Sequence, residues 1–276
     1  MAEDGLQLRA GDERIVVLTG PFAQKALPAL LKSMDGKKTI AQLAEKLAPL
    51  LNEEEIEEAV EMMAERHLLQ DGEEWPEELL YYSNFEIPLE ELQKKLQEAK
   101  LLLIGPPPLT SPLADLFRAH GIAGVREQTF SSLTEEELKN HSLLIYKEDR
   151  FSTQPQQLNE LCMKTKLPWL ISSTAPGTHA VVGPLFVPNE TCCLACYLYR
   201  RQSNTENLVE FIAREKHLYE VGCQKAFGSL PAHETLINSL TVIESLNHII
   251  GHHNCHLYNE CIFIDVTTAK SWREPV

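Results

Sequence analysis

Lys100-Leu-Leu-Leu-Ile104 runs directly into Gly105-Pro-Pro-Pro-Leu-Thr110, and this segment sets the architecture of the larger part of the chain. A short, wholly apolar run bounded by glycine and proline is typical of a buried strand. In nucleotide-binding α/β folds, the loop after the first such strand reads G-x-G-x-x-G, and its backbone N–H groups approach phosphate. The three prolines remove three of these donors. We therefore expect no ATP or NAD binding at this loop.

The segments that follow alternate between strand and helix patterns. They succeed one another at 100–104, 111–120, 125–128, 142–146, 158–165 and 168–171. Such alternation predicts a parallel sheet with helices on its faces. Helical spacing of apolar residues over 234–250 predicts a further helix, used in the core or in an oligomer interface.

The beginning of the chain has a different pattern. Residues 6–18 alternate around Gly11-Asp12 as a hairpin does. Three helical segments and a short closing strand are then expected at 22–34, 39–47, 52–64 and 67–70, with Thr39 and Asn52 as N-caps. This order predicts a winged-helix-like α+β domain over 1–76, followed by a doubly wound α/β domain over 77–276.

The composition narrows the class of protein. Of the 276 residues, 25 are basic and 40 acidic, and the net charge of −15 argues against a nucleic-acid partner. No apolar run reaches the roughly 18–20 residues of a membrane helix, and the acidic start lacks the apolar core of a signal peptide. A cytoplasmic protein is expected. All seven cysteines follow residue 150, and in a reducing compartment such clustering favours metal binding or catalysis over disulfides.

The third helix argues against DNA binding by the first domain. It carries seven glutamates and one arginine at its end: Glu53, Glu54, Glu55, Glu57, Glu58, Glu61, Glu65 and Arg66. A DNA-binding winged helix needs a basic recognition helix. Two interpretations stay open, a structural subdomain and a peptide clamp whose exposed strand edge accepts an added strand.

A family resemblance favours the clamp. Asp35-Gly-Lys-Lys-Thr-Ile-Ala-Gln-Leu43 and, after a helix, Arg66-His-Leu-Leu69 resemble the precursor-recognition domain of ribosomal peptide natural-product pathways. In that family, a leader peptide pairs with an edge strand and packs on the third helix. Carried over, the resemblance implies peptide contacts at Arg14, Ile15, Val16, Val17, Leu18, Glu58, Met62 and Arg66. Met62 lies off the expected core face, and an ordinary half-buried methionine explains it equally well.

A second resemblance covers the chain from about residue 77. The segments 143–151, 158–163 and 166–172 resemble the ThiF-type family, which adenylates the C-termini of ubiquitin-like proteins. Gly183-Pro-Leu-Phe-Val-Pro-Asn-Glu-Thr-Cys-Cys-Leu-Ala-Cys196 resembles the peptide-binding component of thiazole/oxazole-modified microcin cyclodehydratases. That resemblance implies a non-catalytic scaffold that delivers a precursor peptide to a YcaO-type ATP-dependent cyclodehydratase, which forms azolines from Cys, Ser or Thr. It also implies that the second domain can form a homodimer.

The cysteine pattern raises the question of a metal. Cys193 and Cys196 have the two-residue spacing with which two thiolates bind one tetrahedral zinc. In the family, a second pair near the C-terminus completes the site, and residues 197–276 contain no such pair. Three alternatives stay open: the native chain continues, the site is empty, or other residues substitute. The candidates for substitution are Cys255, Cys261, His252, His253 and His256.

An enzymatic alternative also stays open. Asp149 stands at the acidic position of the ThiF-type family, so the chain could be an ATP-dependent adenylyltransferase acting on a peptide. Cys223 lies where relatives that form thioesters carry a nucleophile, and a buried structural cysteine is the simpler interpretation. We therefore expect no catalytic residue on this chain.

Overall fold

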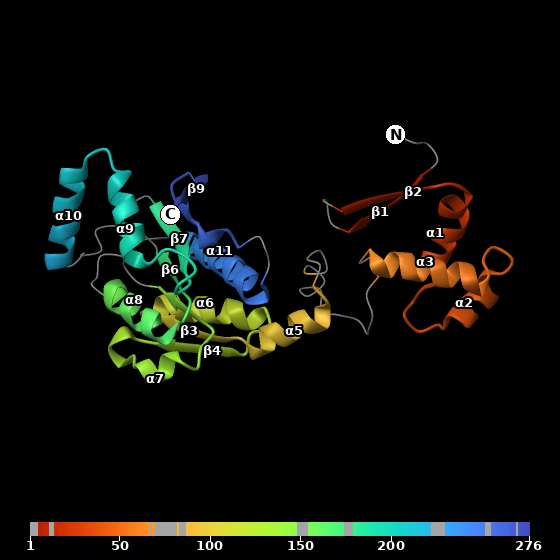
Figure 1. The fold of residues 1–276 in the computed structure, drawn as a ribbon, viewed down its shortest axis with the longest axis horizontal. Coiled ribbons are helices and arrows are strands. Elements are labelled where there is room, and N and C mark those ends of the chain that lie inside the picture. Colours follow the sequence, from red (N-terminus) through yellow and green to blue (C-terminus); the bar gives the residue numbers. More distant parts are fainter. Residues whose placement is uncertain are drawn as a thin grey trace. The chain divides into compact units, whose positions relative to one another are not determined.

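The structure, a computed structural model, describes residues 5–10, 14–66, 68–69, 82, 87–147, 154–173, 179–221, 230–251, 255–268 and 270–276. The chain divides into two compact units, Met1–Glu91 and Leu92–Val276. Figure 1 shows the elements of both. The domain boundary expected between 76 and 77 lies outside the described residues.

The first unit begins with the expected hairpin. Strands β1 (Gly5–Ala10) and β2 (Arg14–Thr19) pair antiparallel, with Leu6 opposite Leu18 and Leu8 opposite Val16. The chain then enters a π-helical turn, η1 (Phe22–Ala26), which continues into α1 (Leu27–Ser33). Alternation around a short loop was sufficient to predict the hairpin, because the side-chain period of a strand is two.

Two further helices complete the core of this unit. Helix α2 (Ile40–Leu47) begins at Thr39 and α3 (Glu53–Glu65) at Asn52, each with the reciprocal hydrogen bonds of a capping box. Both predicted caps are therefore confirmed. The apolar faces of these helices meet α1 in one core cluster: Ala26, Leu27, Leu30, Leu43, Leu47, Leu51, Ile56, Ala59 and Met63.

The predicted wing is not confirmed. Leu68 and Leu69 lie outside any strand, and the N–H of Leu68 donates to the carbonyl of Met63 at 2.8 Å, as at a helix end. His67 and Gln70, the other two residues of the expected strand, lie outside the described residues.

The second unit contains a seven-stranded sheet, in the order β4-β3-β5-β6-β7-β8-β9. Its strands are β3 (Lys100–Ile104), β4 (Gly124–Gln128), β5 (Leu143–Tyr146), β6 (Trp169–Ser173), β7 (His179–Phe186), β8 (Glu260–Asp265) and β9 (Lys270–Pro275). The first four run parallel, and β7, β8 and β9 extend the sheet antiparallel. The predicted parallel sheet is thus confirmed for the four strands over which it was expected, at 100–104, 125–128, 142–146 and 168–171.

Different helices cover the two faces of the sheet. One core cluster combines the sheet with α7 (Glu135–Leu138), α8 (Gln154–Thr165) and α9 (Leu194–Ser203). On the other face, α6 (Pro107–Ala119) contacts β3 and β4, whereas α11 (Pro231–Ile250) contacts β6 and β7. Strands β5 and β6 are buried along their whole length, as coverage of both faces requires.

The remaining elements lie around this framework. Helix α5 (Leu89–Glu98) precedes β3, and α10 (Leu208–Val221) follows α9, beside which Figure 1 places it. Two short turns are η3 (Phe130–Ser132) and η4 (His256–Tyr258). Among the described helices, none has the length and apolar character needed to cross a membrane.

Candidate functional site

The loop after β3 has no backbone donor left for a phosphate. The N–H of Gly105 donates to the carbonyl of Gln128, and Pro106, Pro107 and Pro108 have none. The next two donors, those of Leu109 and Thr110, are both used by the carbonyl of Pro106, at 2.9 and 3.2 Å. Helix α6 starts within the proline run, four residues before the expected start at 111, because proline suits a first helical turn.

Gly105 is required by a close backbone approach. A Cβ atom at this position would lie 2.2 Å from the carbonyl oxygen of Lys147. Gly105 follows β3 and Lys147 follows β5, and these two strands are neighbours in the sheet. Strand β4 lies on one side of this pair and β6 on the other, so the order of the strands reverses between β3 and β5. Open α/β sheets bind ligands at the carboxyl ends of strands at such a switch point. In this chain the two backbone segments are in contact there.

A buried lysine lies at the same switch point. Lys147 is 1 % exposed, and its Nζ lies 3.3 Å from Oε2 of Glu234 on α11 and 3.4 Å from the Oγ of Ser172. The Ser172 hydroxyl in turn contacts the hydroxyl of Thr241 at 2.8 Å. Burial lowers the pKa of Lys147, and the negative charge of Glu234 opposes this shift. The sequence pattern gave no signal for this group.

A carboxylate on β4 is also used internally. Oε2 of Glu127 accepts hydrogen bonds from the hydroxyls of Thr110 and Ser111, at 2.7 and 2.8 Å. In dinucleotide-binding folds, an acidic residue about 20 residues beyond the glycine loop receives the ribose hydroxyls. Here the first turns of α6 occupy this acceptor.

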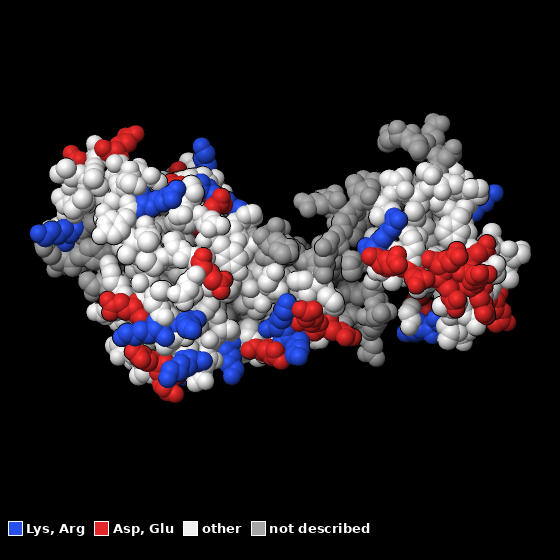
Figure 2. All heavy atoms as spheres, viewed as in Figure 1, with Lys and Arg blue, Asp and Glu red and all other residues white. Residues whose placement is uncertain are grey.

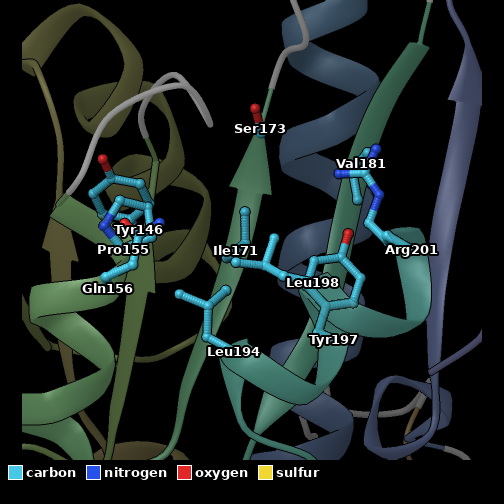
Figure 3. Close-up of a pocket in the computed structure, with 10 residues that line it drawn as sticks. All are labelled: Tyr146, Pro155, Gln156, Ile171, Ser173, Val181, Leu194, Tyr197, Leu198 and Arg201. Carbon is cyan, nitrogen blue, oxygen red and sulfur yellow. The ribbon is translucent and has the colours of Figure 1, made fainter. Parts of the chain in front are cut away.

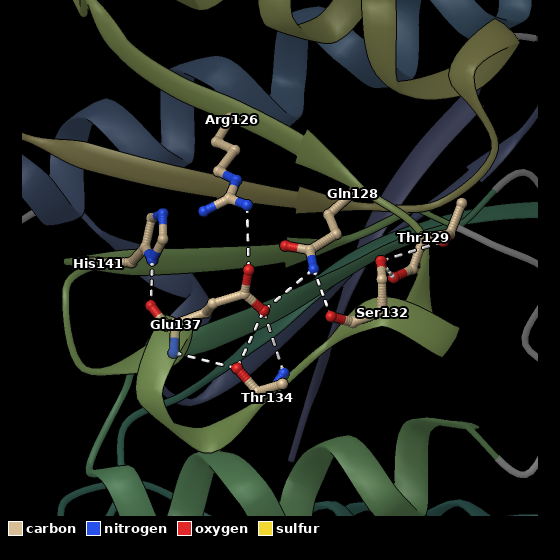
Figure 4. A network of polar contacts seen from close by, with 7 residues as sticks. All are labelled: Arg126, Gln128, Thr129, Ser132, Thr134, Glu137 and His141. Carbon is tan, nitrogen blue, oxygen red and sulfur yellow. Dashed lines mark hydrogen bonds and ion pairs between the residues drawn. The ribbon is translucent and has the colours of Figure 1, made fainter.

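A polar network holds the end of β4 (Figure 4). The Glu137 carboxylate accepts hydrogen bonds from Gln128 at 3.1 Å and from the backbone of Thr134 at 3.2 Å, and it pairs with Arg126 at 3.0 Å. The hydrogen bond from Gln128, followed by those from Thr134 and the charge of Arg126, lowers the pKa of Glu137. The network connects β4 with α7.

The enzymatic alternative depends on two residues, Asp149 and Cys223. Both lie outside the described residues.

The structure brings the two predicted metal ligands together. Cys193 caps α9, and its Sγ lies 3.7 Å from that of Cys196. A hydrogen bond from the backbone N–H of Cys196 lowers the pKa of Cys193. Two thiolates on one tetrahedral zinc, with Zn–S bonds of about 2.3 Å, are about 3.8 Å apart. The pair therefore fits half of a zinc site.

The described residues do not supply the other half. Among them, no three His, Cys, Asp or Glu side chains are placed to share a metal ion. Cys255 and Cys261 are buried, and burial raises the pKa of each to about 12. His256 is exposed, Cys192 is half-buried beside the pair, and His252 and His253 lie outside the described residues.

The predicted peptide-binding residues lie on β2 and α3. Val16 and Leu18 are half-buried, whereas Val17 points outward with 57 % of its surface exposed. Arg14 and Ile15 lie in the same strand. Within the described residues, β2 pairs only with β1, so its second edge has unpaired backbone groups.

The predicted residues of α3 form a stripe. Glu58, Met62 and Arg66 follow at intervals of four, with Glu58 and Arg66 exposed. Met62 is half-buried against the core cluster that Leu18 also contacts. The exposed glutamates of α3 gather on the surface of the first unit (Figure 2). The two halves of the predicted clamp thus share one core.

No family model and no curated protein matches the chain. Several solved structures match its fold. A heterocyclase in complex with substrate and cofactor matches 97 % of the chain with a TM-score of 0.73 and 20 % identity, and the heterocyclase TruD matches 97 % with 0.74 and 21 %. The chain spans only 35 % and 38 % of these two proteins. MccB of E. coli, in a complex with MccA-N7isoASN, matches 99 % of the chain and 95 % of its own length, with a TM-score of 0.60 and 14 % identity. The mixed α/β fold is thereby confirmed.

Proposed function

We propose that this chain is a non-catalytic scaffold in the biosynthesis of azoline-containing ribosomal peptides. Its first unit would bind the leader of a precursor peptide, and its second would dock a YcaO-type ATP-dependent cyclodehydratase. The single observation that carries the non-catalytic assignment is the loop at Gly105, where every backbone donor is absent or used. Likeness to two heterocyclases across both units supports the pathway.

The proposed division of labour follows from the chemistry. Ring formation from Cys, Ser or Thr with ATP needs a phosphate site, and the switch point of this sheet has a buried Lys147 beside a loop whose backbone donors are absent or used. We therefore assign the ATP-dependent step to the partner. A scaffold that holds the leader raises the effective concentration of the core peptide at that partner.

The first unit has the features of a β-augmentation site. The edge of β2 that no described strand pairs with offers backbone donors and acceptors to an extended leader, and side chains of α3 lie beside the same core. Zinc, if bound, would be held by Cys193 and Cys196 at the start of α9 and would stabilise the fold there. A homodimer of the second unit remains part of the proposal.

A labelled leader peptide, taken from a precursor encoded beside this gene, tests the proposal by fluorescence anisotropy with the whole chain. Val17→Glu places a charge on the exposed face of β2 and should weaken binding by about tenfold or more. Val209→Glu is the matched control, because Val209 is 80 % exposed on α10. No saturable binding, or equal loss in both variants, would contradict the clamp.

The second candidate is a peptide adenylyltransferase, and it is supported by the overlap of 99 % of the chain with a structure of MccB that holds AMPCPP together with MccA. It predicts ATP–pyrophosphate exchange in the presence of the precursor. Abolition of the exchange by Asp149→Ala would assign it to this chain. Absence of exchange, together with leader binding, would leave the scaffold as the function.

A further inference from the structure

An apolar pocket lies in the second unit, at the carboxyl ends of β5 and β6 (Figure 3). Its walls are mainly apolar or aromatic, and they comprise Tyr146, Ile171, Val181, Leu194, Tyr197 and Leu198. The pocket belongs to neither the loop at Gly105 nor the proposed leader site.

One buried polar atom lacks a partner in this pocket. Ser173, the last residue of β6, is 1 % exposed, and its Oγ has no hydrogen-bond partner among the described residues. The neighbouring Ser172 points to the opposite face of the sheet, where it contacts Thr241. A hydroxyl that is withdrawn from water and left unpaired is unfavourable unless a ligand or a water satisfies it. The Ser173 hydroxyl is therefore available to a ligand.

An arginine completes the lining. The guanidinium of Arg201 lies 5.8 Å from the ring centres of both Tyr197 and Phe211. Rings contact the faces of a guanidinium, so its in-plane N–H donors stay accessible. Among the described residues, no carboxylate forms an ion pair with Arg201. A guanidinium that pairs with no carboxylate among the described residues is suited to an anion from solution.

Helix α9 presents these groups together. Leu194, Tyr197, Leu198 and Arg201 follow at positions i, i+3, i+4 and i+7, which places them on one face of the helix. Figure 3 shows Tyr197 and Leu198 beside Ile171 on β6, with Ser173 at the tip of that strand. The chain thus combines an apolar chamber with the unpaired hydroxyl of Ser173 and the guanidinium of Arg201.

We propose that this pocket binds a small amphiphilic carboxylate. The apolar body would lie against Ile171, Val181 and the residues of α9, and the carboxylate would accept hydrogen bonds from Arg201. Ser173 would donate its hydroxyl to a polar atom of the ligand. The site is separate from the proposed leader clamp, so neither proposal depends on the other.

Isothermal titration of the whole chain with octanoate tests the site. Saturable binding at or below about 1 mM is expected, and octylammonium, with an apolar body of similar length and the opposite charge, should not bind. A second titration uses N-acetyl-leucine, which has the free carboxylate of a peptide end. Tighter binding of octanoate would assign a free acid as the ligand, and tighter binding of N-acetyl-leucine would assign the carboxyl end of a peptide.

Variants connect the binding to named groups. Arg201→Gln should weaken octanoate binding by about tenfold, the effect of losing one charge-assisted hydrogen bond. Arg200→Gln is the matched control, because the neighbouring Arg200 is exposed and outside the pocket, and it should leave the affinity unchanged. Leu198→Trp should fill the chamber and abolish binding with Arg201 intact.

Three results would overturn the proposal. They are the absence of saturable octanoate binding to the unaltered chain, equal affinity for octanoate and octylammonium, and equal loss of affinity in the Arg200 and Arg201 variants. If Arg201→Gln fails to fold, the Leu198→Trp variant decides alone: undiminished octanoate binding in that variant would overturn the site.

Discussion

Lys147 and Glu234 form an ion pair at 3.3 Å that joins the end of β5 to the first turn of α11. The lysine is buried and the glutamate is 19 % exposed, so water screens the pair poorly. The negative charge also lies at a helix N-terminus, where the helix dipole stabilises it. The pair occupies the position at which related α/β sheets receive ligands.

Removing one partner of this pair should be costly. Glu234→Gln leaves the Lys147 charge buried without a countercharge, and the free energy of unfolding at pH 7 should fall by about 3–5 kcal/mol. Urea denaturation of the whole chain measures the change. Glu210→Gln, at an exposed position on α10, is the control and should change stability by less than about 0.5 kcal/mol.

The loss should depend on pH. Burial lowers the pKa of Lys147 in the folded state, whereas the unfolded lysine keeps its ordinary value of 10.5. Without Glu234 the folded state binds fewer protons than the unfolded state between these two pKa values. The variant should therefore regain stability as the pH rises toward 10.5. A deficit that stays constant up to about pH 10 would contradict a lowered pKa of Lys147 in the folded variant.

Nucleotide binding by the folded chain can be detected as a rise in its Tm. A ligand present at about 100 times its Kd stabilises the folded state by about 2.7 kcal/mol, which shifts Tm by several degrees. Because the Gly105 loop has no available donor, Mg·ATP should leave the Tm of the chain unchanged. Thermal denaturation with and without about 1 mM Mg·ATP measures the shift. A shift of several degrees would instead favour the adenylyltransferase.

Local signals made much of the fold predictable. The hairpin, the caps Thr39 and Asn52 and the strand at 100–104 each depend on residues close in the sequence, and the structure confirms them. The two-residue spacing of Cys193 and Cys196 likewise predicted that their thiols would meet. Helix geometry and strand period decide these features without distant contacts.

Features that depend on distant contacts were missed. Strand β7 pairs antiparallel with β8, which follows it in the chain only after α9, α10 and α11. The contact of Lys147 with Glu234 and the convergence of Ser173 with α9 likewise join segments far apart in the sequence. The peptide contacts on β2 and α3 stay predictions, because they depend on a partner.

Thiol reactivity should divide the cysteines into two groups. The N–H of Cys196 lowers the pKa of Cys193, whereas burial raises the pKa of three others, Cys162, Cys255 and Cys261, to about 12. At pH 8 only about one in 10⁴ of the buried thiols is ionised. Iodoacetamide should therefore label Cys193 and Cys196 before the three buried cysteines, as peptide mapping by mass spectrometry would show.

Added zinc should slow the labelling of Cys193 and Cys196 if both thiolates bind the ion. The chain unfolded in urea is the control, because all its thiols should then react alike. Equal labelling of Cys193 and Cys261 in the folded chain would contradict the burial of Cys261. Labelling of Cys193 and Cys196 that zinc leaves unchanged would argue against their role as ligands.

Proline substitutions at two neighbouring positions of β2 test whether the leader binds as an added strand. In an antiparallel pair, successive N–H groups point alternately toward the partner strand and away from it. Of Val16 and Val17, one therefore donates toward β1 and the other toward the open edge. Val16→Pro and Val17→Pro each remove one donor. The proline on the open side should weaken leader binding with little change in Tm, since it keeps the β1–β2 hydrogen bonds. The other proline should lower Tm. Anisotropy and thermal denaturation of both variants separate the two effects, and unchanged leader affinity in both would rule out strand addition at β2.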